Sequence, residues 1–389
     1  MKVTKLMLMG ALALLGASCS DDDNNSNSGG DLDNLSAKEK TLQGATVDYV
    51  DHTVLPTYKA MADAAIEMRD LCHAMQDKHA AGTVAASDIE AAGKAWKEAR
   101  KNWELSEAFL YGPAANHNID PHIDSWPLDK AAMDRLLEQI RRGAAWDLTN
   151  NGGYGLIGFH AVEYMLFELD ASEDNSLIHN TAYTPEELEY LVAVADDLCQ
   201  QCVLLEACWA GSDNITEAKR RILDDAELGY DENYGGEMKN ARQAGSRFKT
   251  YQEAAEEILQ GCIDIADEVG NTKIGRPAMG SSSEDKNYIE SPYSLNSIED
   301  FADNIRSIRN AYQGSRSGDR SVSDYVRSKD AAVDREVRDA IEAAIVAIER
   351  VPEPFTKNAT GDLSKAAMKA AGTTLVDALE KAVTVVSER

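Results

Sequence analysis

A histidine and a carboxylate stand three positions apart near the middle of the chain, in the stretch Gly158-Phe-His160-Ala-Val-Glu163. On a helix this spacing places both side chains on one face, about 5–6 Å apart, where they could share one ion. Apolar residues fill most of the neighbouring positions, so we expect both groups inside the protein, where a carboxylate needs a partner. The pair is therefore either half of a metal or acid/base site or a core histidine bonded to a carboxylate, and the spacing alone favours neither.

Carboxylates upstream could complete such a site. Glu104 and Glu107 lie three positions apart in a tryptophan-containing stretch, and Asp124 follows His122 in a loop that two prolines make stiff. If these carboxylates met the central pair, they would form a mixed nitrogen and oxygen site suited to Fe, Mn, Zn or Cu. Spacing alone favours the simpler interpretation, in which both glutamates are exposed helix charges and Asp124 is a turn residue. We assign no role to the histidines that lack a partner at ligand spacing, His52, His73, His79, His117 and His179.

The elements that must position these groups are helices. Apolar residues recur at spacings of three and four, and no run of alternating β-branched residues appears, which predicts an all-α fold. In the first half of the chain we expect helices over residues 37–79 with a kink at Pro56, and over residues 88–110, 129–142, 156–169 and 185–210. Capping boxes that begin at Ser36, Ser87 and Thr184 mark three of the helix starts.

The second half repeats this helical pattern. We expect helices over residues 237–269, 297–312, 322–348 and 364–387, and a polar connection over residues 271–292. The layout predicts two helical-bundle domains of three to five helices each, residues 37–225 with the histidine motif and residues 226–389. A short similarity between residues 107–112 and 310–314 suggests an internal duplication.

The first residues carry an export signal. A basic start, an apolar run over residues 6–15 and small residues before Cys19 predict a secretory signal peptide over residues 1–19, too short to span a membrane. Cys19 resembles the lipidated cysteine of bacterial lipoproteins, and the acidic residues 20–23 resemble the surface-export signal of lipoproteins in Bacteroidetes. Residues 20–36 then form a flexible acidic tether. These resemblances imply an outer-membrane lipoprotein, exposed at the cell surface or facing the periplasm; a secreted soluble protein is the alternative.

Composition limits the partners. The net charge is −28 at pH 7 and no cluster of lysines or arginines appears, which argues against nucleic acid as a partner. We interpret most of the acidic residues as solvated helix faces. The five cysteines after Cys19 are an odd number and fit no disulfide framework, so we interpret them as core residues and leave a local bridge between Cys199 and Cys202 open.

The histidine motif also carries a family resemblance. Residues 158–163 match the G-x-H-x-x-E motif of the imelysin-like family, also called the insulin-cleaving membrane protease or imelysin peptidase family. Residues 103–113, 123–127, 265–270 and 304–314 also resemble family sequence. The resemblance thus extends over roughly residues 40–385.

This resemblance implies two four-helix-bundle-like halves with a site near their junction, in a secreted or lipid-anchored protein linked to iron regulation or uptake. In relatives that serve ferrous-iron uptake, the motif and an upstream pair of glutamates look like metal ligands. By this resemblance the ligands here are His160, Glu163, Glu104 and Glu107, with Asp124 less directly implied. The ligand would be a metal ion, iron before zinc or copper, or an iron-bearing compound, and other iron-uptake proteins of the envelope would be partners.

The family name also implies a zinc peptidase, which the sequence argues against. No H-E-x-x-H motif occurs, and Tyr164 stands where the inverted motif H-x-x-E-H has its second histidine. No nucleophile elbow of a serine hydrolase occurs either, so we assign no catalytic residue. We therefore predict an iron-binding lipoprotein. The alternatives are a zinc metallopeptidase and a protein- or glycan-binding lipoprotein in which the motif is structural.

Overall fold

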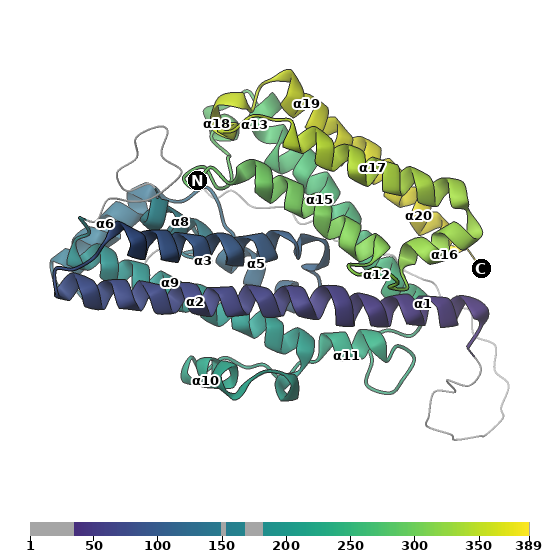
Figure 1. Cartoon of the computed structure of the whole chain (residues 1–389), viewed down its shortest axis with the longest axis horizontal. Helices are drawn as coiled ribbons and strands as arrows, with labels where there is room; N and C mark the ends of the chain where they lie inside the picture. The colour runs from purple at the N-terminus through teal and green to yellow at the C-terminus, as the bar shows by residue number, and fades with distance from the viewer. Residues whose placement is uncertain (1–34, 149–152, 168–181, 389) are drawn as a thin grey trace, which may run out of the picture.

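A computed structural model of the chain describes residues 35–148, 153–167 and 182–388 (Figure 1). Helices of several kinds are the regular structure of these residues and no strand occurs among them, which confirms the all-α prediction. None of the described helices is both long and apolar enough to cross a membrane. The predicted signal peptide, Cys19 and most of the predicted tether lie outside the described residues.

Three long helices organise the first half of the chain. The central helix α2 (Leu55–Ala80) packs against α3 (Ala86–Glu104) and α9 (Pro185–Ala210), and the short α8 (Phe159–Phe167) packs against α3 and α9. Figure 1 shows α2, α3 and α9 running alongside one another, with α8 next to the left-hand part of α3. Shorter helices complete this half: α4 (Pro113–Asn116), α5 (Ile119–Ile123), α6 (Lys130–Arg141), α10 (Glu217–Asp225) and α11 (Tyr234–Lys239).

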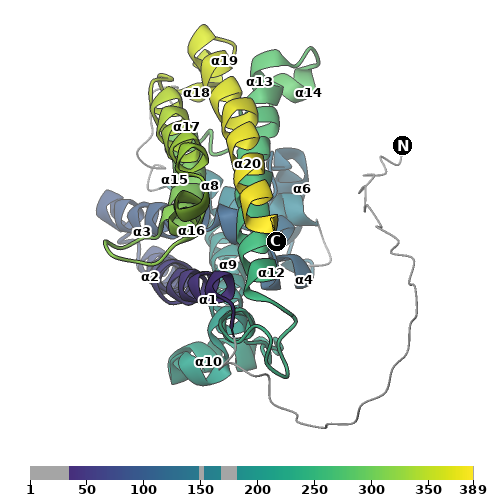
Figure 2. The ribbon, with the colours of Figure 1, turned by 90° about the vertical axis from the view of Figure 1, so that its right-hand side faces the viewer.

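Four longer helices form the second half. Helix α12 (Tyr251–Glu268) packs against α15 (Ser297–Gln313) and α20 (Val376–Ser387), and α17 (Ala331–Glu349) packs against the same two helices. Figure 2 shows α12 and α20 side by side. The remaining helices are α13 (Gly275–Met279), α14 (Ser283–Lys286), α16 (Val322–Lys329), α18 (Phe355–Asn358) and α19 (Asp362–Lys369). The first helix of the chain, α1 (Ala37–Asp48), packs against α12 and α16 of this second half.

The predicted helix over residues 37–79 is close to the observed segment, which continues to Ala80. A π-helical turn, Tyr49–Val54, lies where the kink at Pro56 was expected. The wider turn fits a proline, because proline has no N–H to donate into a regular helix. Ser36 and Thr184 cap their helices as predicted, but Ser87 does not; Asp88 bonds to the backbone N–H of Ala85 instead.

Three other predicted boundaries are wrong. The helix predicted over residues 88–110 ends at Glu104, and a separate 3-10 turn, Glu107–Phe109, follows it. The helix predicted over residues 237–269 is interrupted between α11 and α12, where Thr250 caps the second piece. The helix predicted over residues 322–348 is divided at Asp330, whose side chain accepts hydrogen bonds from the first N–H groups of α17. In the second and third cases a side-chain cap begins a new helix within a pattern that apolar periodicity alone would continue.

Besides α1, the halves meet through α3 and the 3-10 turn that follows it, which pack on α15, and a second close contact lies within the second half. In the first contact, the backbone N–H of Ala108 in the 3-10 turn donates to Ser307 Oγ at 3.0 Å. In the second, the π-helical turn Val269–Lys273 packs on the π-helical turn Ala370–Leu375. A β-carbon on Gly270 would lie 2.2 Å from Gly372 Cα, so only glycine allows this approach. The first of these turns ends at Lys273, whose side chain is buried.

Candidate metal centre

The histidine motif begins at a glycine that no other residue could replace without strain. Gly158 has φ +79°, and a β-carbon there would lie 2.2 Å from the carbonyl oxygen of Ile123. The chain can therefore pass directly beside the loop that carries Asp124 and then enter α8. Every residue of α8 is buried, including His160 and Glu163.

Both ring nitrogens of His160 contact carboxylates. Nδ1 lies 3.0 Å from Glu163 Oε2, and Nε2 lies 3.1 Å from Asp124 Oδ1. Burial lowers the pKa of His160, but the hydrogen bonds to Asp124 and Glu163 outweigh this effect and raise the pKa to about 9. The ring is thus held as an imidazolium that donates to both carboxylates.

Asp124 links this pair to a buried arginine. Its Oδ2 accepts a hydrogen bond from Trp103 Nε1 at 2.8 Å, and its Oδ1 contacts Arg100 as well as His160. Burial raises the pKa of the Asp124 carboxyl, but the charges of Arg100 and His160 outweigh burial and hold this pKa well below its usual range. Asp124 is therefore ionised at any physiological pH.

Arg100 is the centre of a four-carboxylate cluster and is itself fully buried. Besides Asp124, it contacts Glu104 one turn further along α3. It also contacts two carboxylates of the second half, Glu290 with 2.6 Å between Nη2 and Oε1 and Asp300 with 3.2 Å between Nε and Oδ2. The contacts with Glu290 and Asp300 bring together segments that are 190 and 200 positions apart in the sequence.

Lys273 is a second buried cation in the same network. Its Nζ lies 3.0 Å from Glu290 Oε1, 3.2 Å from Glu107 Oε1 and 3.6 Å from Glu104 Oε2. It also lies 5.2 Å from the centre of the Trp126 ring. Glu290 is thus shared between the two cations.

Carboxylates outnumber cations in this network. The six acids Glu104, Glu107, Asp124, Glu163, Glu290 and Asp300 contact three basic groups, Arg100, Lys273 and His160. Burial raises the pKa values of Glu104 and Glu107 well above their usual range, and the nearby cations only partly oppose this. Glu104 Oε1 and Glu290 Oε2 are buried without a hydrogen bond, although the first lies beside Arg100. The network therefore has capacity for further positive charge.

Three sets of ligand atoms lie close enough to hold one ion. Asp124, His160 and Glu290 form the set that includes the histidine. The other sets are Glu104 with Glu107 and Asp124, and Glu104 with Glu290 and Asp300. In each set the ligand atoms lie within 4.8 Å of one another, and all of these residues are buried.

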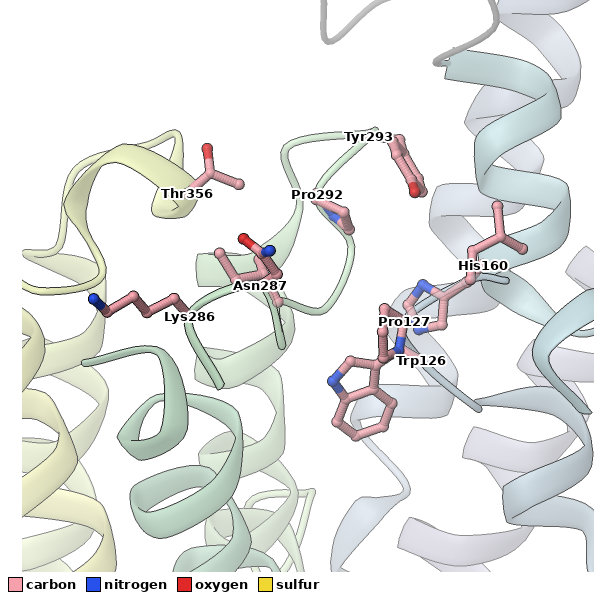
Figure 3. A pocket seen from close by; sticks show the side chains of 10 residues that line it. Trp126, Pro127, His160, Lys286, Asn287, Pro292, Tyr293 and Thr356 are labelled. Atoms are coloured by element: carbon pink, nitrogen blue, oxygen red, sulfur yellow. The ribbon is translucent and has the colours of Figure 1, made fainter. Parts of the chain in front are cut away.

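A cavity of about 200 Å³ gives access to this network at His160. Figure 3 shows Trp126, Pro127 and His160 on its first-half side, facing Lys286, Asn287, Tyr293 and Thr356 of the second half. Trp126 Nε1 is buried and has no hydrogen-bond partner. The cavity is large enough for an ion with several waters or for a small chelating molecule.

The structure brings all five predicted ligands, Glu104, Glu107, Asp124, His160 and Glu163, into one buried network. The simpler interpretation, with exposed glutamates and Asp124 as a turn residue, is therefore wrong. His122 lies outside the network and pairs with Asp197 at 2.9 Å.

Sequence reasoning missed the two buried cations and their acids, Arg100, Lys273, Glu290 and Asp300. Glu290 and Lys273 lie in the stretch over residues 271–292 that was expected to be a polar connection. That stretch contains two short helices, α13 and α14. The five cysteines are free, including Cys199 and Cys202, so the bridge that was left open does not form.

Comparison with known proteins identifies the family. The imelysin family model matches residues 54–386. Iron-regulated protein A of Synechococcus elongatus is 27% identical over 350 residues, which cover 88% of this chain and 85% of that protein.

Two crystal structures share the fold. One, described as a precursor of an iron-regulated protein A from Parabacteroides distasonis, has a TM-score of 0.75 and 26% identity, and covers 90% of this chain and 96% of its own. The other, an imelysin-like protein from Psychrobacter arcticum, has a TM-score of 0.57 and 13% identity over 91% of this chain and 95% of its own, and supports the fold alone. The match of the family model over most of the chain shows that this protein belongs to the imelysin family.

Proposed function

We propose that this protein is an envelope lipoprotein that binds a metal ion, iron before zinc or copper, at the buried centre between its halves, and that it serves iron uptake. The observation that carries the proposal is the excess of six carboxylates over three basic groups in one buried network. Burial favours the protonated forms of Glu104 and Glu107, and a bound cation would take the place of their protons, which would leave to solvent.

The donor atoms suit a transition metal. If one ring nitrogen of His160 gives up its proton to solvent, that nitrogen and carboxylate oxygens of Asp124 and Glu290, which lie within 4.8 Å of one another, can bind one ion. Mixed nitrogen and oxygen ligands favour Fe, Mn or Zn over purely soft or purely hard ions. Iron is preferred because relatives similar to this chain are named as iron-regulated proteins.

A metal ion would compete with Lys273 for these oxygens. Arg100 is a planar group held by four carboxylates, whereas Lys273 carries a point charge on a flexible stem. We therefore propose that Lys273 gives way when an ion enters and that Arg100 stays in place.

Glu163 orients the histidine. Its Oε1 accepts hydrogen bonds from the backbone N–H of Tyr293 at 3.1 Å, the backbone N–H of Ser294 at 2.8 Å and Ser294 Oγ at 2.7 Å, while Oε2 contacts His160. A carboxylate that positions a ligating imidazole is a common second partner in metal sites. The same bonds occupy the carboxylate that a zinc peptidase would need as its general base, which supports binding over hydrolysis.

Metal analysis tests this proposal. The chain, purified without a histidine tag, is dialysed against Fe²⁺ under anaerobic conditions and, separately, against Zn²⁺, and bound metal is counted. We expect bound metal in the wild type and a loss of more than about 100-fold in affinity in His160→Ala and Asp124→Asn, since even outer partners cost about 10–100-fold. His122→Ala is the matched control, because this histidine pairs with Asp197 outside the network.

Two results would count against the proposal. If the wild type bound neither ion, or if His160→Ala bound as tightly as wild type, the centre would not be a metal site. Chelator-sensitive cleavage of a peptide library that is lost in His160→Ala would instead establish the peptidase.

The lipoprotein part of the proposal rests on residues 1–23 and has its own test. Labelling cells with a fatty-acid probe should modify the wild type and leave Cys19→Ala unmodified. Protease added to intact cells should remove the wild-type protein if it is exposed at the surface. An unlabelled wild-type protein released into the medium would support a secreted soluble protein.

A further inference from the structure

A histidine, a cysteine and a glutamate meet at a second place in the first half of the molecule. His117 directly follows α4, Cys208 lies in the last turn of α9, and Glu232 lies in the segment between α10 and α11. His117 Nε2 is 3.8 Å from Cys208 Sγ and 3.7 Å from Glu232 Oε1. Figure 2 shows α4 and α9 in the lower part of the molecule, away from α13, α14 and α19 at the top.

The histidine contacts Cys208 at the long range of a hydrogen bond to sulfur, and its distance to Glu232 is too long for a direct hydrogen bond, but both distances are short enough for a shared ion. An N–H group normally donates to oxygen at about 2.7–3.2 Å, well below the 3.7 Å observed to Glu232. Ligands of a tetrahedral zinc, with bonds of about 2.0–2.3 Å, lie roughly 3.5 Å from one another. All three ligand atoms lie within 4.8 Å of one another.

The glutamate has an unused buried oxygen. Glu232 Oε2 is inaccessible to solvent and has no hydrogen-bond partner. Cys208 is buried, whereas the side chains of His117 and Glu232 are 32% and 29% exposed. The cluster is thus closed at the thiol and open to water at the imidazole and the carboxylate.

This cluster offers one sulfur, one nitrogen and one oxygen donor. Such a set favours a different ion from the one that the carboxylate centre favours. Thiolate and imidazole favour zinc, and other borderline or soft ions, over magnesium and calcium, which require oxygen ligands. Three protein ligands leave one tetrahedral position for a water molecule.

We propose that His117, Cys208 and Glu232 form a second metal site that binds Zn²⁺. Binding exchanges the thiol proton of Cys208, which leaves to solvent, for a zinc–sulfur bond. The ion would join the end of α9 to the residue that follows α4 and to the segment between α10 and α11. The site is independent of the proposed function, because none of its three ligands belongs to the network around His160.

Cobalt substitution tests this site directly. The full chain, purified without a histidine tag and carrying His160→Ala to disable the first centre, is titrated with Co²⁺ and then with Zn²⁺. We expect a thiolate-to-cobalt charge-transfer band that saturates at one equivalent and disappears when Zn²⁺ displaces Co²⁺. Zinc should also raise the melting temperature by a few degrees.

Three variants and one control identify the ligands. Cys208→Ser should abolish the band. His117→Gln should weaken zinc binding by more than about 100-fold, and Glu232→Gln should weaken it by about tenfold or more. The two latter changes are at partly exposed side chains and leave the core intact. Cys202→Ser removes another buried thiol of α9, one that belongs to no cluster of three metal-ligating groups among the described residues, and should behave like its parent.

The proposal fails if the parent shows no charge-transfer band. It also fails if the band persists in Cys208→Ser, which would place the thiolate ligand elsewhere, or if His117→Gln and Glu232→Gln both bind Zn²⁺ as tightly as the parent does.

Discussion

Arg100 and Asp300 lie 200 positions apart in the chain, yet Nε of the arginine and Oδ2 of the aspartate meet at 3.2 Å in the interior. Arg100 comes from α3 of the first half and Asp300 from α15 of the second. Arg100 also contacts Glu290 of the second half. Ion pairs therefore connect the two halves at the place where the proposed centre lies.

The first prediction concerns this arginine. Arg100→Lys keeps the charge but cannot reach four carboxylates, so it should lower the free energy of unfolding by about 3–5 kcal/mol, as breaking a buried ion pair does. Urea unfolding followed by circular dichroism measures the loss. Arg309→Lys is the control, because Arg309 makes one exposed ion pair at 3.5 Å. If the two variants were equally stable, the buried ion pairs of Arg100 would contribute no more to the free energy of unfolding than the exposed ion pair of Arg309.

The second prediction concerns the competing cation. Lys273→Met removes a positive charge from the carboxylates that a metal would bind. One unit charge at about 4 Å is worth roughly 4 kcal/mol at an effective dielectric of 20, so metal affinity should rise about tenfold or more. The metal-free protein should meanwhile become less stable, because Glu107 and Glu290 lose their partner. Isothermal titration with Zn²⁺ measures the change in metal affinity, and thermal melting without metal measures the change in stability. A lower affinity for Zn²⁺ in Lys273→Met would contradict the proposal that Lys273 competes with the metal.

The third prediction concerns the glycine of the motif. Gly158→Ala should destabilise the fold by about 2 kcal/mol or more, because the new β-carbon adds a clash with Ile123 to the cost of a positive φ. Gly82→Ala is the matched control, since Gly82 has φ +68° and open space around it. Melting temperatures should fall further for Gly158→Ala than for Gly82→Ala, and the reverse order would show that the clash is relieved by a shift of the loop.

The fourth prediction concerns pH. Asp303 Oδ1 accepts from Arg306 Nη1 at 2.6 Å, but Oδ2 is buried and unpaired, and burial raises the pKa of this carboxyl from 3.8 to about 6. A raised carboxyl pKa destabilises the folded protein above pH 6, and this penalty is lost as pH falls from 6 toward 3.8. The shift corresponds to at most about 3 kcal/mol.

Replacing the carboxylate should remove that penalty. Asp303→Asn should be more stable than wild type at pH 8, and the difference should shrink as pH falls to 4. Urea unfolding at several pH values measures it, with the exposed Asp77→Asn as the control. A stability difference that does not change with pH would show that the carboxyl is not the cause.

The sequence was sufficient for the helical class and for naming five residues that lie in one buried network, but not for their partners. His160 and Glu163 share a helix face by spacing alone, and the family resemblance added Glu104, Glu107 and Asp124. Nothing local distinguishes Arg100 from a solvated helix charge. Its burial depends on acids that arrive from α15 and from the stretch over residues 271–292, which are contacts at long range in the chain.

Two predicted helices were wrong because a local cap begins a new helix within the helical pattern. Thr250 accepts from the backbone N–H of Glu253, a cap that could have been recognised in Thr250-Tyr-Gln-Glu253. Asp330 begins α17 in the same manner. Apolar periodicity continues through both positions, so it predicts one helix where the backbone forms two.

The contact between Gly270 and Gly372 gives the last part of the chain a role in the centre. Gly270 lies three residues before Lys273 in the same π-helical turn, and its backbone rests on Gly372 with no room for a side chain. The depth to which the lysine enters the network therefore depends on how closely the two turns approach. Substitutions around Gly372, far from the histidine motif, would therefore shift the charge balance of the proposed centre without changing any of its acidic residues or His160.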